Sequence, residues 1–173
     1  IYNNGGTLTI VNSYFLNNTA TNSGGAIYNN GGSITVTGST FDGNDLINRN
    51  VNGNGGAAIF TENGNVLIST STITNNLKNI VHRGGTGDYA GDLISAAVSN
   101  DGGTLTVTDS YFENNSGSYG GAILSQGDDA VLSVVGSTFE DNFAFNGDMN
   151  IPYEIGCKMQ KKRIECAIAL KAE

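Results

Sequence analysis

Apolar and polar residues alternate with a period of two in short stretches along most of this 173-residue chain. In residues 24–44, Ile34 and Val36 alternate with hydroxyl residues. Further on, Ser39 and Phe41 are two positions apart and so lie on one face of the next stretch. This alternation is typical of half-buried strands with apolar side chains inward and polar ones outward. Gly-Gly and Asn-Gly pairs lie between the stretches and allow the positive φ values of tight turns. We therefore predict short strands joined by tight turns.

The same stretch occurs five times along the chain, complete or degraded. Each copy ends in an aromatic or aliphatic residue followed three positions later by asparagine, and the pairs are Phe15/Asn18, Phe41/Asn44, Ile73/Asn76, Phe112/Asn115 and Phe139/Asn142. Serine lies two positions before each of these apolar residues, and aliphatic residues lie five and seven positions before it. Such columns at fixed spacing identify a repeat architecture.

A single copy cannot bury its inward residues, and its strand edges stay unpaired. Parallel stacking of the copies solves both problems, because each strand pairs with its counterpart one rung away. We predict an all-β, right-handed parallel β-helix of about five three-strand rungs, since parallel crossovers are nearly always right-handed. The ten paired residues above should form a structural ladder, with each asparagine amide bonding to turn backbone or to the next asparagine.

The repeat covers residues 1–146 and begins in mid-repeat, so we interpret the chain as a fragment. Residues 147–173 do not follow the pattern. The spacing of Met159, Ile164, Ile168 and Leu170 predicts a short helix over Lys158–Ala172. This tail is a native C-terminal cap, a stretch of non-native residues at a fragment's end, or the start of another domain.

Rungs differ in the connection that follows the asparagine. The Phe-position spacings are 26, 32, 39 and 27, and the extra residues precede the next GGAI-like element. The longest connection, Leu77–Leu93, is the candidate binding loop, with His82, Arg83, Asp88 and Asp92 as its candidate residues. One histidine is too few for a zinc site, and a lone histidine in a Gly-rich loop is usually solvated.

The net charge of the chain limits the classes of partner that it can bind. The chain has 16 acidic and 8 basic residues, a formal net charge of −8, which argues against nucleic acid. Both cysteines, Cys157 and Cys166, lie in the tail, and two cysteines leave the redox compartment open. No apolar run approaches the length of a transmembrane helix.

The GGAI element at Gly24–Ile27 and Gly120–Ile123, together with the FxxN pairs, resembles the repeat of polymorphic outer-membrane proteins and related adhesin-like β-helix proteins of bacterial and archaeal surfaces. The resemblance covers residues 1 to about 146. It implies a non-enzymatic segment of a cell-surface, outer-membrane or secreted protein, linked to adhesion. The partner would be a protein or glycan of a host or neighbouring cell, and a membrane or wall anchor would lie elsewhere in a larger parent polypeptide.

Two alternatives stay open. Parallel β-helices also host polysaccharide lyases and glycoside hydrolases, so the chain could be a fragment of a carbohydrate-active enzyme. Asp128 and Asp129 faintly resemble the paired aspartates of polygalacturonases, but the companion Asn-Thr-Asp, Gly-His-Gly and Arg-Ile-Lys segments are missing. We therefore predict no catalytic, cofactor-binding or metal-binding residues. A purely structural spacer is the second alternative.

Weaker binding features accompany these alternatives. The oxygen-rich turns could hold an adventitious Ca²⁺, but their spacing fits no calcium motif. Tyr2, Tyr14, Tyr28 and Tyr111 are predicted to point outward, where aromatic rings could stack on sugars; outward tyrosines are also ordinary on strand faces.

Overall fold

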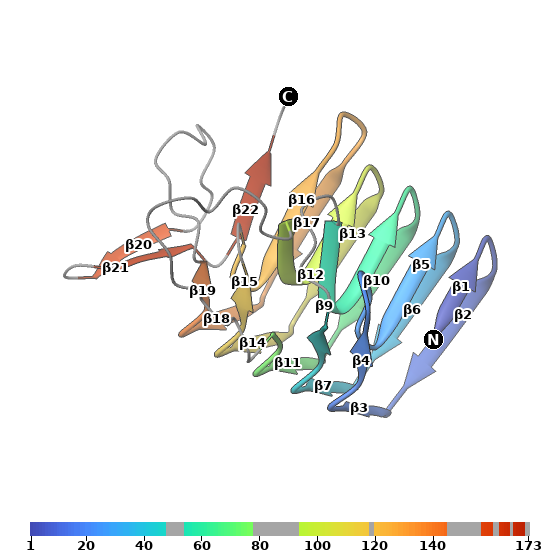
Figure 1. The fold of residues 1–173 in the computed structure, drawn as a ribbon, viewed down its shortest axis with the longest axis horizontal. Coiled ribbons are helices and arrows are strands. Elements are labelled where there is room, and N and C mark those ends of the chain that lie inside the picture. Colours follow the sequence, from blue (N-terminus) through green and yellow to red (C-terminus); the bar gives the residue numbers. More distant parts are fainter. Residues whose placement is uncertain are drawn as a thin grey trace.

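The computed structural model describes residues 1–47, 54–77, 94–117, 120–144, 157–160, 163–166 and 168–171. Three parallel sheets run along the long axis, and each rung contributes one strand to each of them (Figure 1). The fold is the predicted parallel β-helix. The first sheet contains, in spatial order, β1 (Tyr2–Asn4), β5 (Ile27–Asn30), β9 (Asn54–Glu62), β12 (Ile94–Asp101), β16 (Ile123–Gln126) and β22 (Ile168–Lys171).

The other two main sheets have one strand for each of the five rungs. The second contains β2 (Thr7–Val11), β6 (Ser33–Thr37), β10 (Asn65–Ser69), β13 (Thr104–Thr108) and β17 (Val131–Val135). The third contains β3 (Tyr14–Leu16), β7 (Thr40–Asp42), β11 (Thr72–Thr74), β14 (Tyr111–Glu113) and β18 (Thr138–Glu140).

Short strand pairs complete the described structure. After the third sheet the chain adds a two-residue strand in four rungs, which the sequence pattern did not predict. These strands pair as β4 (Thr19–Ala20) with β8 (Asp45–Leu46) and β15 (Ser116–Gly117) with β19 (Phe143–Ala144). In the tail, β20 (Cys157–Gln160) pairs antiparallel with β21 (Arg163–Cys166).

Like residues lie on like residues from rung to rung. Val36 is in register with Ile68, and Ile68 with Val107. The inward set is almost completely buried in the middle rungs, with Ile27, Val36 and Phe41 all 0% exposed. In the two end rungs the inward residues Leu8, Phe15, Leu132, Val134 and Phe139 are partly buried. The apolar core therefore runs through all five rungs without a break, as the period-two pattern predicts.

The aromatic members of the core stack face to face. The ring centroids of Phe15 and Phe41 lie 4.6 Å apart with planes 3° from parallel, and those of Phe112 and Phe139 lie 4.8 Å apart. Ile73 separates these two stacks and is itself fully buried. Parallel in-register pairing imposes the face-to-face geometry, because identical side chains one rung apart adopt the same orientation.

The GGAI glycines are required where rungs approach one another. Gly24 has a φ of 64°, which favours glycine over residues with a Cβ atom. A Cβ atom on Gly25 would collide with the backbone carbonyl oxygens of Ala57 and Asp45. The motif therefore marks the point where the chain enters the first sheet, and there the neighbouring backbone lies too close to leave room for a side chain.

The lengthened fifth rung keeps its register. Val98 pairs with Ile123 and Leu105 with Leu132, so two extra residues lie between the paired strands of that rung. They form a turn in which the Ala130 backbone N–H donates to the Gly127 carbonyl oxygen at 3.0 Å. The sequence shows the same two extra residues, because Ile123 lies sixteen positions before Phe139 whereas Ile27 lies fourteen positions before Phe41.

The predicted helix over 158–172 is wrong. The described part of this segment is β20, β21 and β22, and β22 adds in parallel to the edge of β16, pairing Ile168 with Ile123. Helix propensity is a weak local preference, whereas the open edge of β16 offers a full row of backbone donors and acceptors. Within the described residues there is also no helix long and apolar enough to cross a membrane.

Candidate functional site

The FxxN asparagines form a hydrogen-bonded ladder along one corner of the β-helix. The Asn44 side-chain amide donates to the Asn76 side-chain oxygen at 2.9 Å, and Asn76 donates in the same way to Asn115. Asn18 and Asn142 extend the ladder at its two ends. Each of the three middle asparagines is 0% exposed, so these amides act inside the protein. Their role in the described structure is to join rungs.

The ladder amides of Asn44, Asn76, Asn115 and Asn142 contact backbone as well. The Asn76 amide donates to the Phe41 carbonyl oxygen at 3.1 Å, while the Asn76 oxygen accepts the Asn44 backbone N–H at 3.0 Å. A parallel ladder of serines satisfies further backbone groups: the Ser39 backbone N–H donates to the Ser71 hydroxyl oxygen at 3.1 Å. Buried polar groups are stable only when they are paired, and these pairs fix the register between rungs.

Rung length varies mainly at one place. From the first-sheet residue to the ladder asparagine the chain takes 17 positions in four rungs, as from Ile27 to Asn44, and 19 in the rung with the insertion. The return connections, from one ladder asparagine to the next first-sheet residue, take 9, 15, 22 and 8 positions. Apart from the two-residue insertion of the fifth rung, length variation is therefore confined to the corner that follows the asparagine ladder.

The candidate binding loop belongs to the longest return connection. Its predicted residues His82, Arg83, Asp88 and Asp92 lie outside the described residues. The described residues before it end at Leu77, and those after it begin at Ile94 with β12 of the first sheet.

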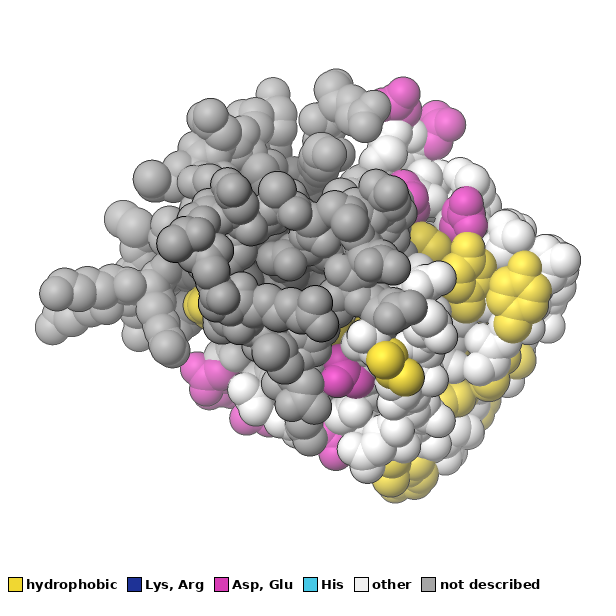
Figure 2. Space-filling view, viewed as in Figure 1, with side chains coloured by type: hydrophobic (Ala, Val, Ile, Leu, Met, Phe, Trp, Pro, Cys, Tyr) yellow, Lys and Arg dark blue, Asp and Glu magenta, His cyan; other side chains and the backbone are white. Residues whose placement is uncertain are grey.

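Aromatic and acidic side chains meet on the outer side of the first sheet. We define the Tyr28 surface as Tyr2, Tyr28, Phe60, Asn30 and Glu62. The Tyr2 and Tyr28 ring centroids are 5.4 Å apart and those of Tyr28 and Phe60 are 5.1 Å apart. Tyr2 is 64% exposed, Tyr28 is half-buried and Phe60 is buried. Figure 2 shows hydrophobic side chains beside acidic ones over these first rungs.

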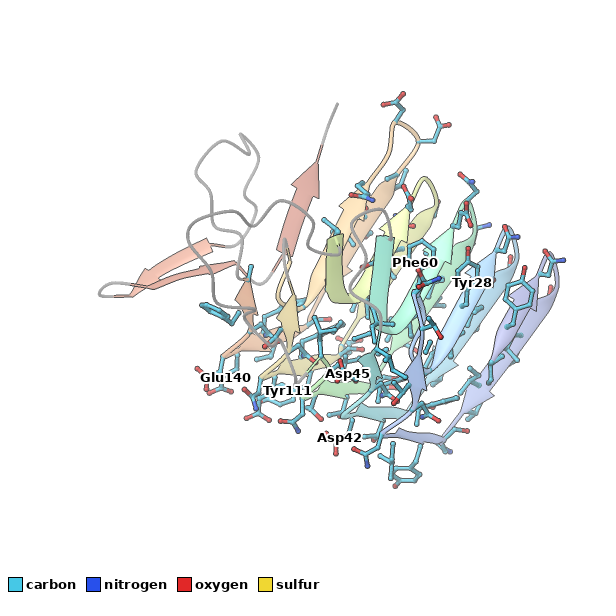
Figure 3. All side chains as sticks on the ribbon, in the orientation of Figure 1. Tyr28, Asp42, Asp45, Phe60, Tyr111 and Glu140 are labelled. Atoms are coloured by element: carbon cyan, nitrogen blue, oxygen red, sulfur yellow. The ribbon has the colours of Figure 1, made fainter. Side chains whose placement is uncertain are left out.

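A hydrogen bond fixes the orientation of the Tyr28 side chain on this surface. The Tyr28 hydroxyl donates to Glu62 Oε2 at 2.5 Å, reaching across one rung. Figure 3 shows Tyr28 beside Phe60, its aromatic neighbour in the next rung. Burial and, second to it, the hydrogen bond to the Glu62 carboxylate together raise the pKa of Tyr28 to about 12. The Tyr28 ring is therefore held as a neutral donor, with its apolar face flanked by amide and carboxylate groups. Such a combination can contact a sugar or a peptide.

A similar pair lies on the third sheet. The Tyr111 hydroxyl donates to Glu140 Oε2 at 2.8 Å, and this hydrogen bond is the main reason that the pKa of Tyr111 rises to about 12. Nearby, Asp42 accepts hydrogen bonds from the Asn75 amide at 2.8 Å and the Thr74 hydroxyl at 3.4 Å. These carboxylates are tied to neighbours in adjacent rungs.

Other predicted residues lie apart from these pairs. Tyr14 is 75% exposed at the first-rung end of the third sheet. Asp128 and Asp129 are exposed in the turn of the fifth rung. Among the residues that the structure describes, no three His, Cys, Asp or Glu side chains group closely enough to hold a metal ion.

Sequence reasoning placed the tyrosines outward but missed their acidic partners. Glu62 and Glu140 share the outward parity of their strands, and counting positions from Ile59 and Phe139 would have placed each one rung from its tyrosine. Phe60 was also missed. It has outward parity yet is only 4% exposed and packs against Tyr28.

Comparison with known proteins adds one finding. The family model described as the Chlamydia polymorphic membrane protein repeat matches residues 12–30 and 109–126. Each match includes a ladder serine, an FxxN pair, a return connection and a GGAI element, so it covers the corner at which rung length varies. Searches of characterised proteins and of solved structures found no match.

Proposed function

Because this chain carries repeats of the polymorphic membrane protein family, we propose that it is a segment of a surface adhesin: a rigid β-helix stalk that presents loops for adhesion. The repeat family indicates an outer-membrane or surface location. Adhesion itself, and the protein or glycan that is bound, form the proposal.

The observation that carries this proposal is the division of each rung into a constant and a variable part. The path through the three sheets takes 17 positions in four rungs, while the return connection ranges from 8 to 22. A scaffold that needs only to stack has no use for connections of such different lengths. Variable loops on a constant frame are the usual arrangement of binding repeat proteins.

The frame has the properties that a stalk needs. Its apolar core is continuous, and the asparagine and serine ladders join each rung to the next through buried hydrogen bonds. Because each rung contacts mainly its neighbours, further rungs can lengthen the stalk without changing its cross-section.

The Tyr28 surface is a second candidate contact surface, on the first sheet. The return connections end where β9 and β12 begin, and Phe60 of this surface belongs to β9. On this surface the ring of Tyr2 is exposed and open to contact by a partner. An aromatic face bordered by the amide of Asn30 suits a neutral glycan or a peptide without strong negative charge, since the chain is acidic.

Cell binding by the purified chain tests the proposal. Replacing residues 78–93 by a Gly-Ser linker of equal length should reduce binding to cultured cells at least tenfold, without lowering the free energy of unfolding. The matched control replaces Asp128 and Asp129 by serine in the exposed turn, and it should bind normally. Equal binding by the parent and the linker variant would favour a structural spacer and overturn the proposal. Pretreating the cells with glycosidases or with protease distinguishes a glycan from a protein partner.

A further inference from the structure

The two cysteines of the chain lie opposite one another in the tail. Cys157 opens β20 and Cys166 closes β21, and the two are register partners in the antiparallel pair. The same register places Lys158 opposite Glu165 and Met159 opposite Ile164. A pairing of opposite charges and a pairing of apolar residues both support this register over one shifted by a residue.

The register alone brings the Cα atoms of the two cysteines to a separation that a disulfide can span. Directly opposed residues of an antiparallel pair have Cα atoms about 4.5 Å or 5.5 Å apart, depending on whether they exchange hydrogen bonds. A disulfide requires a Cα separation of roughly 4.4 to 6.8 Å. Either kind of opposed pair meets this requirement, so no rearrangement of β20 and β21 is needed.

From this register we propose that Cys157 and Cys166 form an intramolecular disulfide that clamps the β20–β21 hairpin. The proposal does not depend on adhesion. An outer-membrane or surface protein reaches an oxidising compartment, where disulfides form and persist.

The bond forms by exchange with a small-molecule disulfide such as oxidised glutathione. The thiolate of one cysteine attacks a glutathione sulfur, forms a mixed disulfide and releases one glutathione thiolate. The second cysteine, as its thiolate, then attacks the protein sulfur of that mixed disulfide and releases the second glutathione. Two protein thiols lose their protons and two electrons in total, and one glutathione disulfide is reduced to two thiols.

The clamp acts on the end of the β-helix. Strand β22 begins two positions after Cys166 and pairs with the edge of β16. Unpaired sheet edges invite association with other chains. A hairpin closed by a disulfide has fewer conformations available when β22 is detached, so the bond favours the state in which the β16 edge is covered.

Redox titration of the whole chain tests this. After incubation with oxidised glutathione, the protein should be monomeric without reductant, resist maleimide at both cysteines and have lost two hydrogens in mass. In a glutathione buffer series, the effective concentration of the two thiols should be at least tenfold higher in native buffer than in urea. Persisting free thiols, stable glutathione adducts or disulfide-linked dimers would each overturn the proposal.

A composition-preserving swap provides the matched control. Exchanging two neighbours, Cys157→Lys with Lys158→Cys, moves one thiol by a single position, which changes the sheet face in a strand. The distance along an unfolded chain hardly changes. The native effective concentration should therefore fall at least tenfold, whereas the value in urea should stay the same. Equal native values for the swap and the parent would show that strand register does not form the bond.

Discussion

The side-chain oxygen of Asn76 accepts two hydrogen bonds from Asn44, one from its backbone N–H at 3.0 Å and one from its amide at 2.9 Å. Asn76 thus satisfies two buried donors of the rung before it. At the same time its own amide reaches the Phe41 carbonyl oxygen at 3.1 Å. Each ladder asparagine of this kind therefore holds its rung to the preceding one through several hydrogen bonds.

Asn76→Leu should destabilise the chain strongly, because it leaves buried donors of Asn44 without partners. An unsatisfied buried group costs about 1–3 kcal/mol, so a loss of at least about 2 kcal/mol is expected in urea unfolding. Asn18→Leu is the matched control, since the exposed Asn18 is only a donor to its neighbour within the ladder. Equal losses for the two variants would contradict the ladder's contribution.

Phe41→Ala should cost about 3–5 kcal/mol, because it removes a fully buried ring from the core and leaves a cavity. The ring also stacks on Phe15. Tyr14→Ala, on the outer side of the neighbouring strand, should change the unfolding free energy by no more than about 0.5 kcal/mol. A cost near zero for Phe41→Ala would show that this residue is not part of the core.

Glu140→Gln and Glu62→Gln should affect their tyrosines differently. The hydrogen bond to Glu140 is the main cause of the raised pKa of Tyr111, so Glu140→Gln should lower that pKa toward 10. Burial is the main cause for Tyr28, so Glu62→Gln should lower its pKa less. Phenolate absorbance during an alkaline titration measures both. A larger change at Tyr28 than at Tyr111 would contradict these assignments.

The same two tyrosines make stability depend on pH in the alkaline range. Each pKa is about 12 in the folded protein, against about 10 in an unfolded chain. Between these values the folded state holds more protons than the unfolded state, so the free energy of unfolding falls as pH rises. The stabilisation is complete below about pH 10 and lost above about pH 12. The double variant Tyr28→Phe, Tyr111→Phe should lose less stability between these pH values.

Thr61→Asn should extend a separate ladder of side-chain hydrogen bonds in the first sheet, which is interrupted after Thr61. Asn29 donates to the Thr61 hydroxyl at 3.0 Å, but in the described structure the buried side-chain oxygen of Asn100, one rung further, has no donor. An asparagine at position 61 could accept from Asn29 and donate to Asn100, which should stabilise the protein by about 1 kcal/mol. The thermal midpoint measures this. A neutral or destabilising result would indicate that a buried water already serves Asn100.

The predicted β-helix follows from residues whose effect is local and repeated. Ile34, Val36 and Phe41 alternate with polar residues, and Gly24 takes a φ that L side chains rarely adopt, so each repeat specifies its own turns and inward face. The columns of the repeat then specify the register, because any slip would move the inward side chains outward. The asparagine ladder was also accessible, since a polar residue kept at one position of every rung must be paired when buried.

The pairs on the outer surface were less accessible. Tyr28 and Glu62 are 34 positions apart, and a return connection of variable length lies between them. The period-two pattern gives the side on which each residue lies, but it does not give which partner a flexible hydroxyl selects.

The sequence by itself therefore determined the stacking, the inward faces, the glycine turns and the corner at which the loops depart, because these depend on patterns inside one repeat. Only the tertiary structure decided which secondary structure the tail adopts, and that Phe60 is buried. Residues 158–172 have a local preference for helix, yet the unpaired edge of β16 recruits β22 as a strand. An edge that needs partners exists only once the rungs have stacked, and no local pattern in the tail records it.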